Sequence, residues 1–139
     1  SFIGELAFFA GEHIDGYQQY GPGNKVNVTI DHSTISGCAG NSTDKGNAAV
    51  FWSDHPGAGS TFTLMHSKLS CGQYTIRVND ALAGSKVIVD IHDNQIVRGS
   101  YASGPAECAN SVKFNGTEGV KWSNVLYSDN GEQIPTPCS

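Results

Sequence analysis

Short stretches in which apolar and polar residues alternate constrain the fold of this chain more than any other feature. They are rich in β-branched and aromatic residues, and the clearest lie at 26–30, 61–64, 74–78 and 87–91. A period of two is typical of strands that bury one face, and these residue types favour strands. Turn-forming residues such as Asn115-Gly116 separate the stretches. The chain therefore contains several short, half-buried strands.

The number and spacing of these strands predict one all-β domain spanning residues 1–139. Few segments keep a helical period, so we expect at most one or two short helices, at 79–84 and 106–112. Short strands in close succession, with a hairpin turn at Asn115-Gly116, indicate an antiparallel β-sandwich. A closed β-barrel or a β-trefoil is the alternative. With 17 glycines in the chain, the resemblance between 9–16 and 52–59 is too weak to define a repeat.

Four well-separated cysteines, Cys38, Cys71, Cys108 and Cys138, add a covalent constraint. None forms a C-x-x-C pair, which argues against a zinc ribbon or a thioredoxin-type site. An even number predicts two disulfides and no free thiol. Of the three possible pairings we expect Cys38–Cys71 and Cys108–Cys138, because sequential pairs suit a chain of consecutive strands.

Three N-x-[ST] sequons, at Asn27, Asn41 and Asn115, are N-glycosylation acceptors in a secreted protein. Together with the paired cysteines they predict a secreted, extracellular glycoprotein, and we expect all three asparagines to be exposed. The apolar stretch at 6–10 is too short for a signal peptide core or a membrane span. We therefore expect a processed chain that begins at Ser1 and does not insert into a membrane.

The charge of the chain excludes some partners. Eight basic and thirteen acidic residues give a net charge of -5, and the basic residues form no cluster. Phosphate binding requires concentrated lysine and arginine, so we expect no nucleic acid and no anionic membrane as a partner.

Histidines beside carboxylates are the candidates for catalysis. Asp90 and His92 share one strand face and could hydrolyse a glycoside or a phosphodiester. Either of the two arginines, Arg98 or Arg77, would be the anion clamp. No nucleophile elbow or phosphate-binding loop accompanies them. His32 and His66 are expected on the apolar faces of their strands. Since no histidine spacing typical of a metal site occurs, we predict no metal and no cofactor.

Two tryptophans have neighbours suited to sugar recognition, which combines an aromatic face with polar groups on loops. Trp52 precedes Asp54 and His55, and Trp122 precedes Asn124. In particular, we expect Trp52 to be half-exposed at the start of a turn. The alternative is that both tryptophans anchor the core.

These features favour non-enzymatic recognition outside the cell. We expect a lectin-like or defence-related binding protein whose partner is a glycan or a cell-surface glycoprotein. A small secreted hydrolase using Asp90 and His92 is the first alternative, so enzymatic activity stays open. A secreted inhibitor or a structural cell-wall protein is the second.

Overall fold

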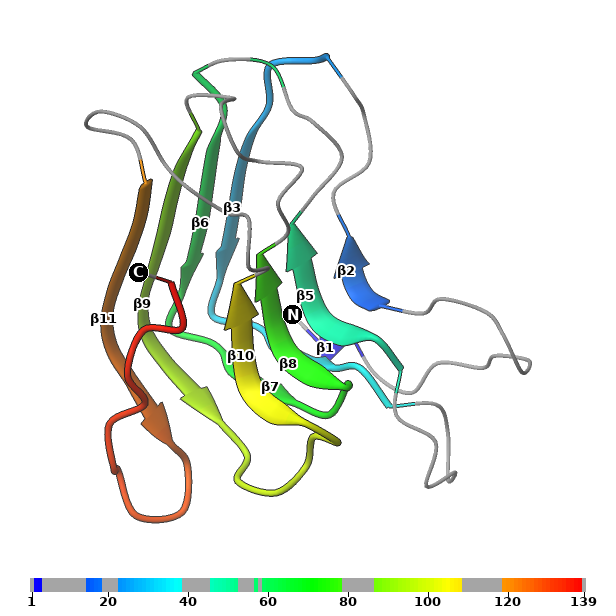
Figure 1. Ribbon diagram of the computed structural model, residues 1–139, viewed down its shortest axis with the longest axis vertical. Helices are drawn as coiled ribbons and strands as arrows, with labels where there is room; N and C mark the ends of the chain where they lie inside the picture. The colour runs from blue at the N-terminus through cyan, green and yellow to red at the C-terminus, as the bar shows by residue number, and fades with distance from the viewer. Residues whose placement is uncertain are drawn as a thin grey trace.

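The strands of this chain pair in parallel across large sequence separations (Figure 1). The computed structural model describes residues 2–3, 15–18, 23–38, 46–52, 57, 59–78, 87–108 and 119–138. Within these ranges the chain forms strands and no helix. The strands are β1 (Phe2–Ile3), β2 (Asp15–Gln18), β3 (Asn27–Asp31), β4 (Thr34–Ser36), β5 (Ala48–Trp52), β6 (Thr61–Met65), β7 (Lys68–Ser70), β8 (Tyr74–Val78), β9 (Ile88–Ile96), β10 (Gly104–Cys108) and β11 (Gly119–Tyr127).

These strands wind into a parallel β-solenoid with three faces. The first face stacks β2, β5, β8 and β10. The second stacks β3, β6 and the first halves of β9 and β11. The third stacks β1, β4, β7 and the second halves of β9 and β11. In Figure 1 the second face appears as the row of long strands and the first as the row in front of it. Each residue thus lies beside the equivalent residue of the next coil.

The predicted antiparallel sandwich is wrong, as are its alternatives, the closed barrel and the trefoil, because both sheets are parallel. The predicted positions of the strands are confirmed. Alternation indicates which side chains of a strand are buried, but it does not indicate which other strand pairs with it. Successive strands here turn onto a new face of the coil instead of folding back as a hairpin. The helix expected at 106–112 is also wrong at its start, because Ala106–Cys108 belong to β10. The other helix, at 79–84, and the turn at Asn115-Gly116 lie outside the described residues.

The core consists of columns of inward side chains, one from each coil. Phe62 lies in register with Val89, and Leu64 with Ile91. These four side chains are completely buried, as the alternation predicted. Stacking like on like in this way buries a continuous core that no single coil could form alone.

A repeated turn joins the second face to the third. At this turn one residue of each coil takes the left-handed conformation: φ is 48° at His32, 50° at His66, 56° at Asp93 and 50° at Asn124. Asparagine and aspartate adopt this conformation more readily than most residues. The turn points these four side chains outward and the next residue of each coil inward.

Three of the four inward residues after this turn, Ser33, Ser67 and Asn94, form a buried polar ladder, and Val125 takes the place in the fourth coil. The Ser33 amide donates to Ser67 Oγ at 3.1 Å, and the Ser67 amide donates to Asn94 Oδ1 at 3.0 Å. Asn94 Nδ2 in turn donates to the Leu64 carbonyl at 2.8 Å. The ladder therefore satisfies backbone groups that would otherwise be buried without partners.

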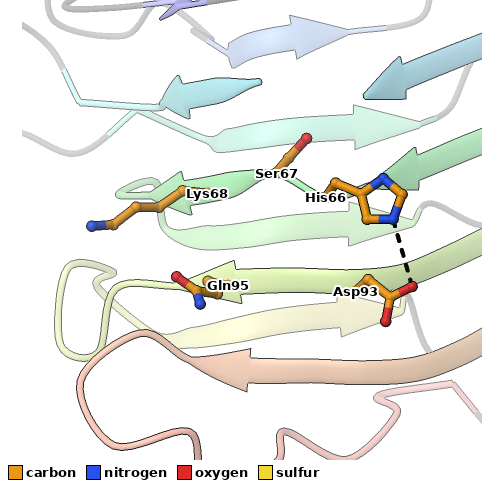
Figure 2. A pocket seen from close by; sticks show the side chains of 5 residues that line it. All are labelled: His66, Ser67, Lys68, Asp93 and Gln95. Carbon is orange, nitrogen blue, oxygen red and sulfur yellow. Dashed lines mark ion pairs between the residues drawn. The ribbon is translucent and has the colours of Figure 1, made fainter. Parts of the chain in front are cut away.

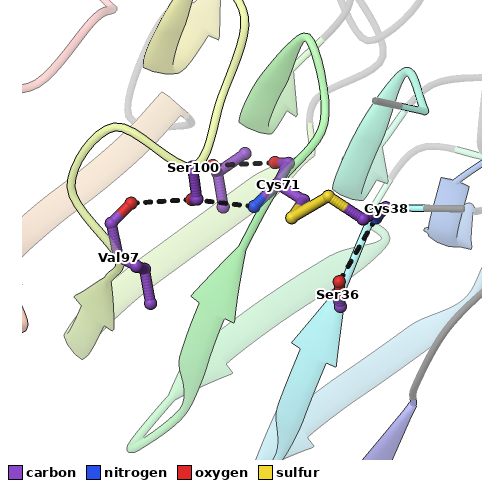
Figure 3. The surroundings of a disulfide bond; sticks show 6 residues. Ser36, Cys38, Cys71, Val97 and Ser100 are labelled. Carbon is purple, nitrogen blue, oxygen red and sulfur yellow. Dashed lines mark hydrogen bonds between the residues drawn. A yellow bond between two sulfur atoms is a disulfide. The ribbon is translucent and has the colours of Figure 1, made fainter. Parts of the chain in front are cut away.

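Both expected disulfides are present, Cys38–Cys71 and Cys108–Cys138. Figure 3 shows the first, which joins the ends of β4 and β7 in successive coils, with the Cys71 amide donating to Ser100 Oγ at 2.9 Å. The described residues contain no free cysteine. This covalent framework is compatible with an extracellular protein.

The segment 128–138 returns along the edge of β11. The Ile134 amide donates to the Val125 carbonyl at 2.8 Å, and the Tyr127 amide to the Glu132 carbonyl at 2.9 Å. Trp122 Nε1 donates to the Ile134 carbonyl at 2.7 Å, and the Ile134 side chain is buried. The second disulfide ties this segment to β10.

Candidate functional site

The outward residues of the repeated turn form a column that we call the turn ladder: His32, His66, Asp93 and Asn124. Adjacent parallel strands lie about 4.8 Å apart, so side chains at equivalent positions of successive coils touch. The rings of His32 and His66 lie 4.8 Å apart between centroids. The fold thus gathers on one exposed edge polar residues that are distant in sequence.

His66 lies at the centre of the ladder and contacts a carboxylate on each side. Its Nδ1 is 2.9 Å from Asp31 Oδ1, and its Nε2 is 3.8 Å from Asp93 Oδ2. Figure 2 shows the second of these contacts. His92 Nδ1 lies 2.8 Å from the same Asp93 oxygen, so that oxygen faces two imidazole rings.

Hydrogen bonds favour the ionised form of the two carboxylates in this cluster. An ionised carboxylate only accepts, so His66 donates from Nδ1 to Asp31. Its Nε2 faces Asp93. Asn124 Nδ2 donates to Asp93 Oδ1 at 2.6 Å. This bond, followed by the bond from His92, lowers the pKa of Asp93. The bond from His66 is the main cause that lowers the pKa of Asp31. Both carboxylates are therefore ionised at neutral pH.

Two overlapping groups have donors that could hold a metal ion: Asp31–His32–His66 and His66–His92–Asp93. The donor atoms within each group lie within 4.8 Å of one another. Tetrahedral zinc with bonds near 2.05 Å separates its ligand atoms by about 3.3 Å. The distances of 2.8 Å and 3.8 Å from Asp93 Oδ2 to the two imidazoles lie on either side of that value.

The second group is the better organised of the two. Asp31 is hydrogen-bonded to Nδ1 of His66, the nitrogen that faces away from Asp93. Asn124 donates to Oδ1 of Asp93, the oxygen that faces away from the two imidazoles. Such outer partners orient metal ligands in known sites. The first group instead depends on His32, whose side chain is 75% exposed, whereas that of His92 is 26% exposed.

A pocket of about 310 Å³ adjoins this second group. It is lined by His66, Ser67, Lys68, Asp93 and Gln95 (Figure 2). Two of these, His66 and Asp93, also belong to the donor group. All five lining residues are polar, and the volume is near the lower end for small-molecule sites.

The tryptophans do not form the sugar platform expected from the sequence. Trp52 is 0% exposed and stacks on Phe62 with ring centroids 5.3 Å apart, so its predicted half-exposure is wrong. Trp122 is partly buried against the core and bonds to the C-terminal segment, whereas Asn124 points outward in the turn ladder. Asp54 and His55 lie outside the described residues.

Two residues of the expected catalytic group, His92 and Arg98, have other partners. Asp90 lies on the outer side of the second face, in register with Thr63 and Lys121. His92 pairs with Asp93 instead. Arg98 follows β9, and its guanidinium bonds to Asp129 at 2.9 Å and to Glu132 at 2.6 Å.

Sequence reasoning placed His32 and His66 on the apolar faces of their strands, and this is wrong because the left-handed turn interrupts the alternation. It also missed Asp31 and Asp93 as partners of His66, which lies in a different coil from either of them. The sequon at Asn27 is exposed, and its strand has the predicted register. Asn41 and Asn115 lie outside the described residues.

Comparison with known protein families, with curated proteins and with solved structures found no match. The class of the protein therefore comes from its own fold and site. It is a disulfide-bonded parallel β-solenoid with a histidine–carboxylate cluster on one exposed turn. In the described ranges no helix has the length and apolar character needed to cross a membrane.

Proposed function

We propose that this protein is an extracellular binding protein, with no catalytic activity of its own, that holds a divalent transition-metal ion at His66, His92 and Asp93. One observation carries the proposal. Two imidazoles and a carboxylate converge on a common point, and two of the three ligands already have an outer partner. The sequence predicted no metal, because the spacing that matters is between coils.

The donor set indicates which ions would bind. Two imidazole nitrogens and one carboxylate oxygen suit Zn²⁺, Cu²⁺ or Ni²⁺, whereas Ca²⁺ and Mg²⁺ prefer oxygen ligands throughout. The ion would bind His92 and Asp93 in place of the hydrogen bond that now joins them. Three protein ligands leave a fourth tetrahedral position open.

The glycan ligand expected from the sequence has less support. The buried Trp52 offers no stacking surface, and no tryptophan, tyrosine or phenylalanine lines the pocket. The hydrolase alternative has less support, since the guanidinium of an expected anion clamp, Arg98, is engaged with Asp129 and Glu132. A metal site at His66, His92 and Asp93 requires neither an exposed tryptophan nor a free Arg98.

The test is calorimetric titration of the whole chain with Zn²⁺ after treatment with a chelator. We expect one ion per chain, and an excess of 100-fold over Kd should add about 2.7 kcal/mol to the free energy of unfolding. His66→Gly should abolish binding. His32→Gly is the matched control, because it removes the same side chain from the same backbone conformation and should leave binding intact. Equal binding by both variants would contradict the proposed ligand set.

A second variant tests the outer partner of Asp93. Asn124→Gly keeps a residue suited to the left-handed conformation and removes only the amide that holds the carboxylate. We expect the affinity for Zn²⁺ to fall by about tenfold without a change in stoichiometry. An unchanged affinity in the same titration would show that Asn124 does not orient Asp93.

A further inference from the structure

We infer that the metal-loaded site binds a small organic carboxylate in the adjoining pocket. The inference rests on the proposed metal site and names its ligand class. His66 and Asp93 belong both to the donor group and to the pocket wall. The open position of the ion is therefore available to a molecule in the pocket.

The charge of the pocket explains why the ligand is an anion. Without metal, the formal charges of Asp93 and Lys68 cancel. A divalent ion adds two positive charges, so the ion and the pocket lining carry a net charge of about +2, or about +1 when the ionised Asp31 beside His66 is counted. The metal therefore converts a neutral pocket into one that attracts anions.

Lys68 supplies the second anchor. It lines the pocket beside Gln95, its partner in register, and lies toward the end away from the His66–Asp93 pair (Figure 2). Among the described residues its ammonium has no carboxylate partner. A ligand with a carboxylate at each end can place one on the metal ion and the other beside Lys68, while Gln95 can donate a hydrogen bond from its amide.

Succinate is a suitable probe, and succinamide is its neutral counterpart. We expect the zinc-loaded protein to bind succinate and not succinamide, and the metal-free protein to bind neither. Added salt should weaken succinate binding, because the site is open to solvent. The metal content is measured after each titration to confirm that succinate has not removed the ion.

Lys68→Gln should keep its bound Zn²⁺ and lose about fivefold in succinate affinity. Lys25→Gln is the matched control, because Lys25 precedes β3 and does not line the pocket. Failure to bind Zn²⁺ would overturn the proposed function and this inference together. Three outcomes would overturn this inference alone, provided that Zn²⁺ binds. Succinate does not bind, or it binds equally with and without the metal, or it binds the two lysine variants with equal affinity.

Discussion

Trp52→Ala is expected to lower the free energy of unfolding by about 4 kcal/mol, the usual cost of truncating a large aromatic residue in a core. The indole is completely buried and stacks on Phe62 between the first and second faces of the coil. Truncation would leave a cavity that the surrounding columns cannot fill, because each is held by backbone pairing to the next coil. Denaturant unfolding measures the loss.

Trp52→Phe is the control for this prediction. Among the described residues Nε1 of Trp52 has no hydrogen-bond partner. Phenylalanine therefore removes volume without breaking a bond, and we expect it to cost less than half as much as alanine. Equal stability of Trp52→Ala and the parent protein would show that the indole does not anchor the core.

Asn94→Ala is expected to cost about 3 kcal/mol, because it leaves two buried backbone groups without partners. These are the Ser67 amide and the Leu64 carbonyl, which belong to the neighbouring coil. Alanine fills the space poorly and satisfies neither group. The melting temperature should fall by roughly 10 °C for a chain of this size.

Gln95→Ala serves as the reference for this second variant, since Gln95 is the next residue and its side chain is exposed. We expect it to change stability by less than about 0.5 kcal/mol. If the two variants unfold at the same denaturant concentration, the hydrogen bonds of Asn94 in the buried polar ladder do not stabilise the fold.

The positions of the strands could be predicted from the sequence, but their pairing could not. Alternation at 61–64 and 87–91 follows from one-sided burial, which any half-buried sheet imposes. Alternation does not distinguish a strand that pairs with the next strand of the chain, as in a hairpin, from a strand that pairs with the equivalent strand one coil later. The mistaken antiparallel topology came from taking consecutive strands as neighbours in space.

A signal for the solenoid was nevertheless present. The six-residue stretches at 30–35, 64–69, 91–96 and 122–127 each begin and end with an apolar residue and carry histidine, aspartate or asparagine at the third place, as IDHSTI, LMHSKL, IHDNQI and WSNVLY. Hydrogen bonds join each stretch to the next, two in the buried polar ladder and one in the turn ladder. The residues that they join are 34, 27 and 31 positions apart in the sequence. Unequal spacing hid the repeat, because the segments elsewhere in each coil differ in length.

The candidate site could not be predicted either, because it also depends on which residues of successive coils lie in register. His66 and Asp93 are 27 positions apart and meet only because their coils stack in register. The left-handed turn that exposes them also reverses the face that alternation assigns to a histidine at the end of a strand. The burial of Trp52 likewise depends on how the first face packs against the second, which the turn residues after β5 did not reveal.

The returning segment 128–138 has a consequence for solubility. A solenoid that ends in an open strand offers its backbone donors and acceptors to a strand of another molecule, and so to end-to-end polymerisation. Here the groups of Val125 and Tyr127 that face away from β9 are already bonded within the same chain, to Ile134 and Glu132. The disulfide of Cys138 keeps this segment in place. The second half of β11 is thus protected from pairing with a strand of another molecule.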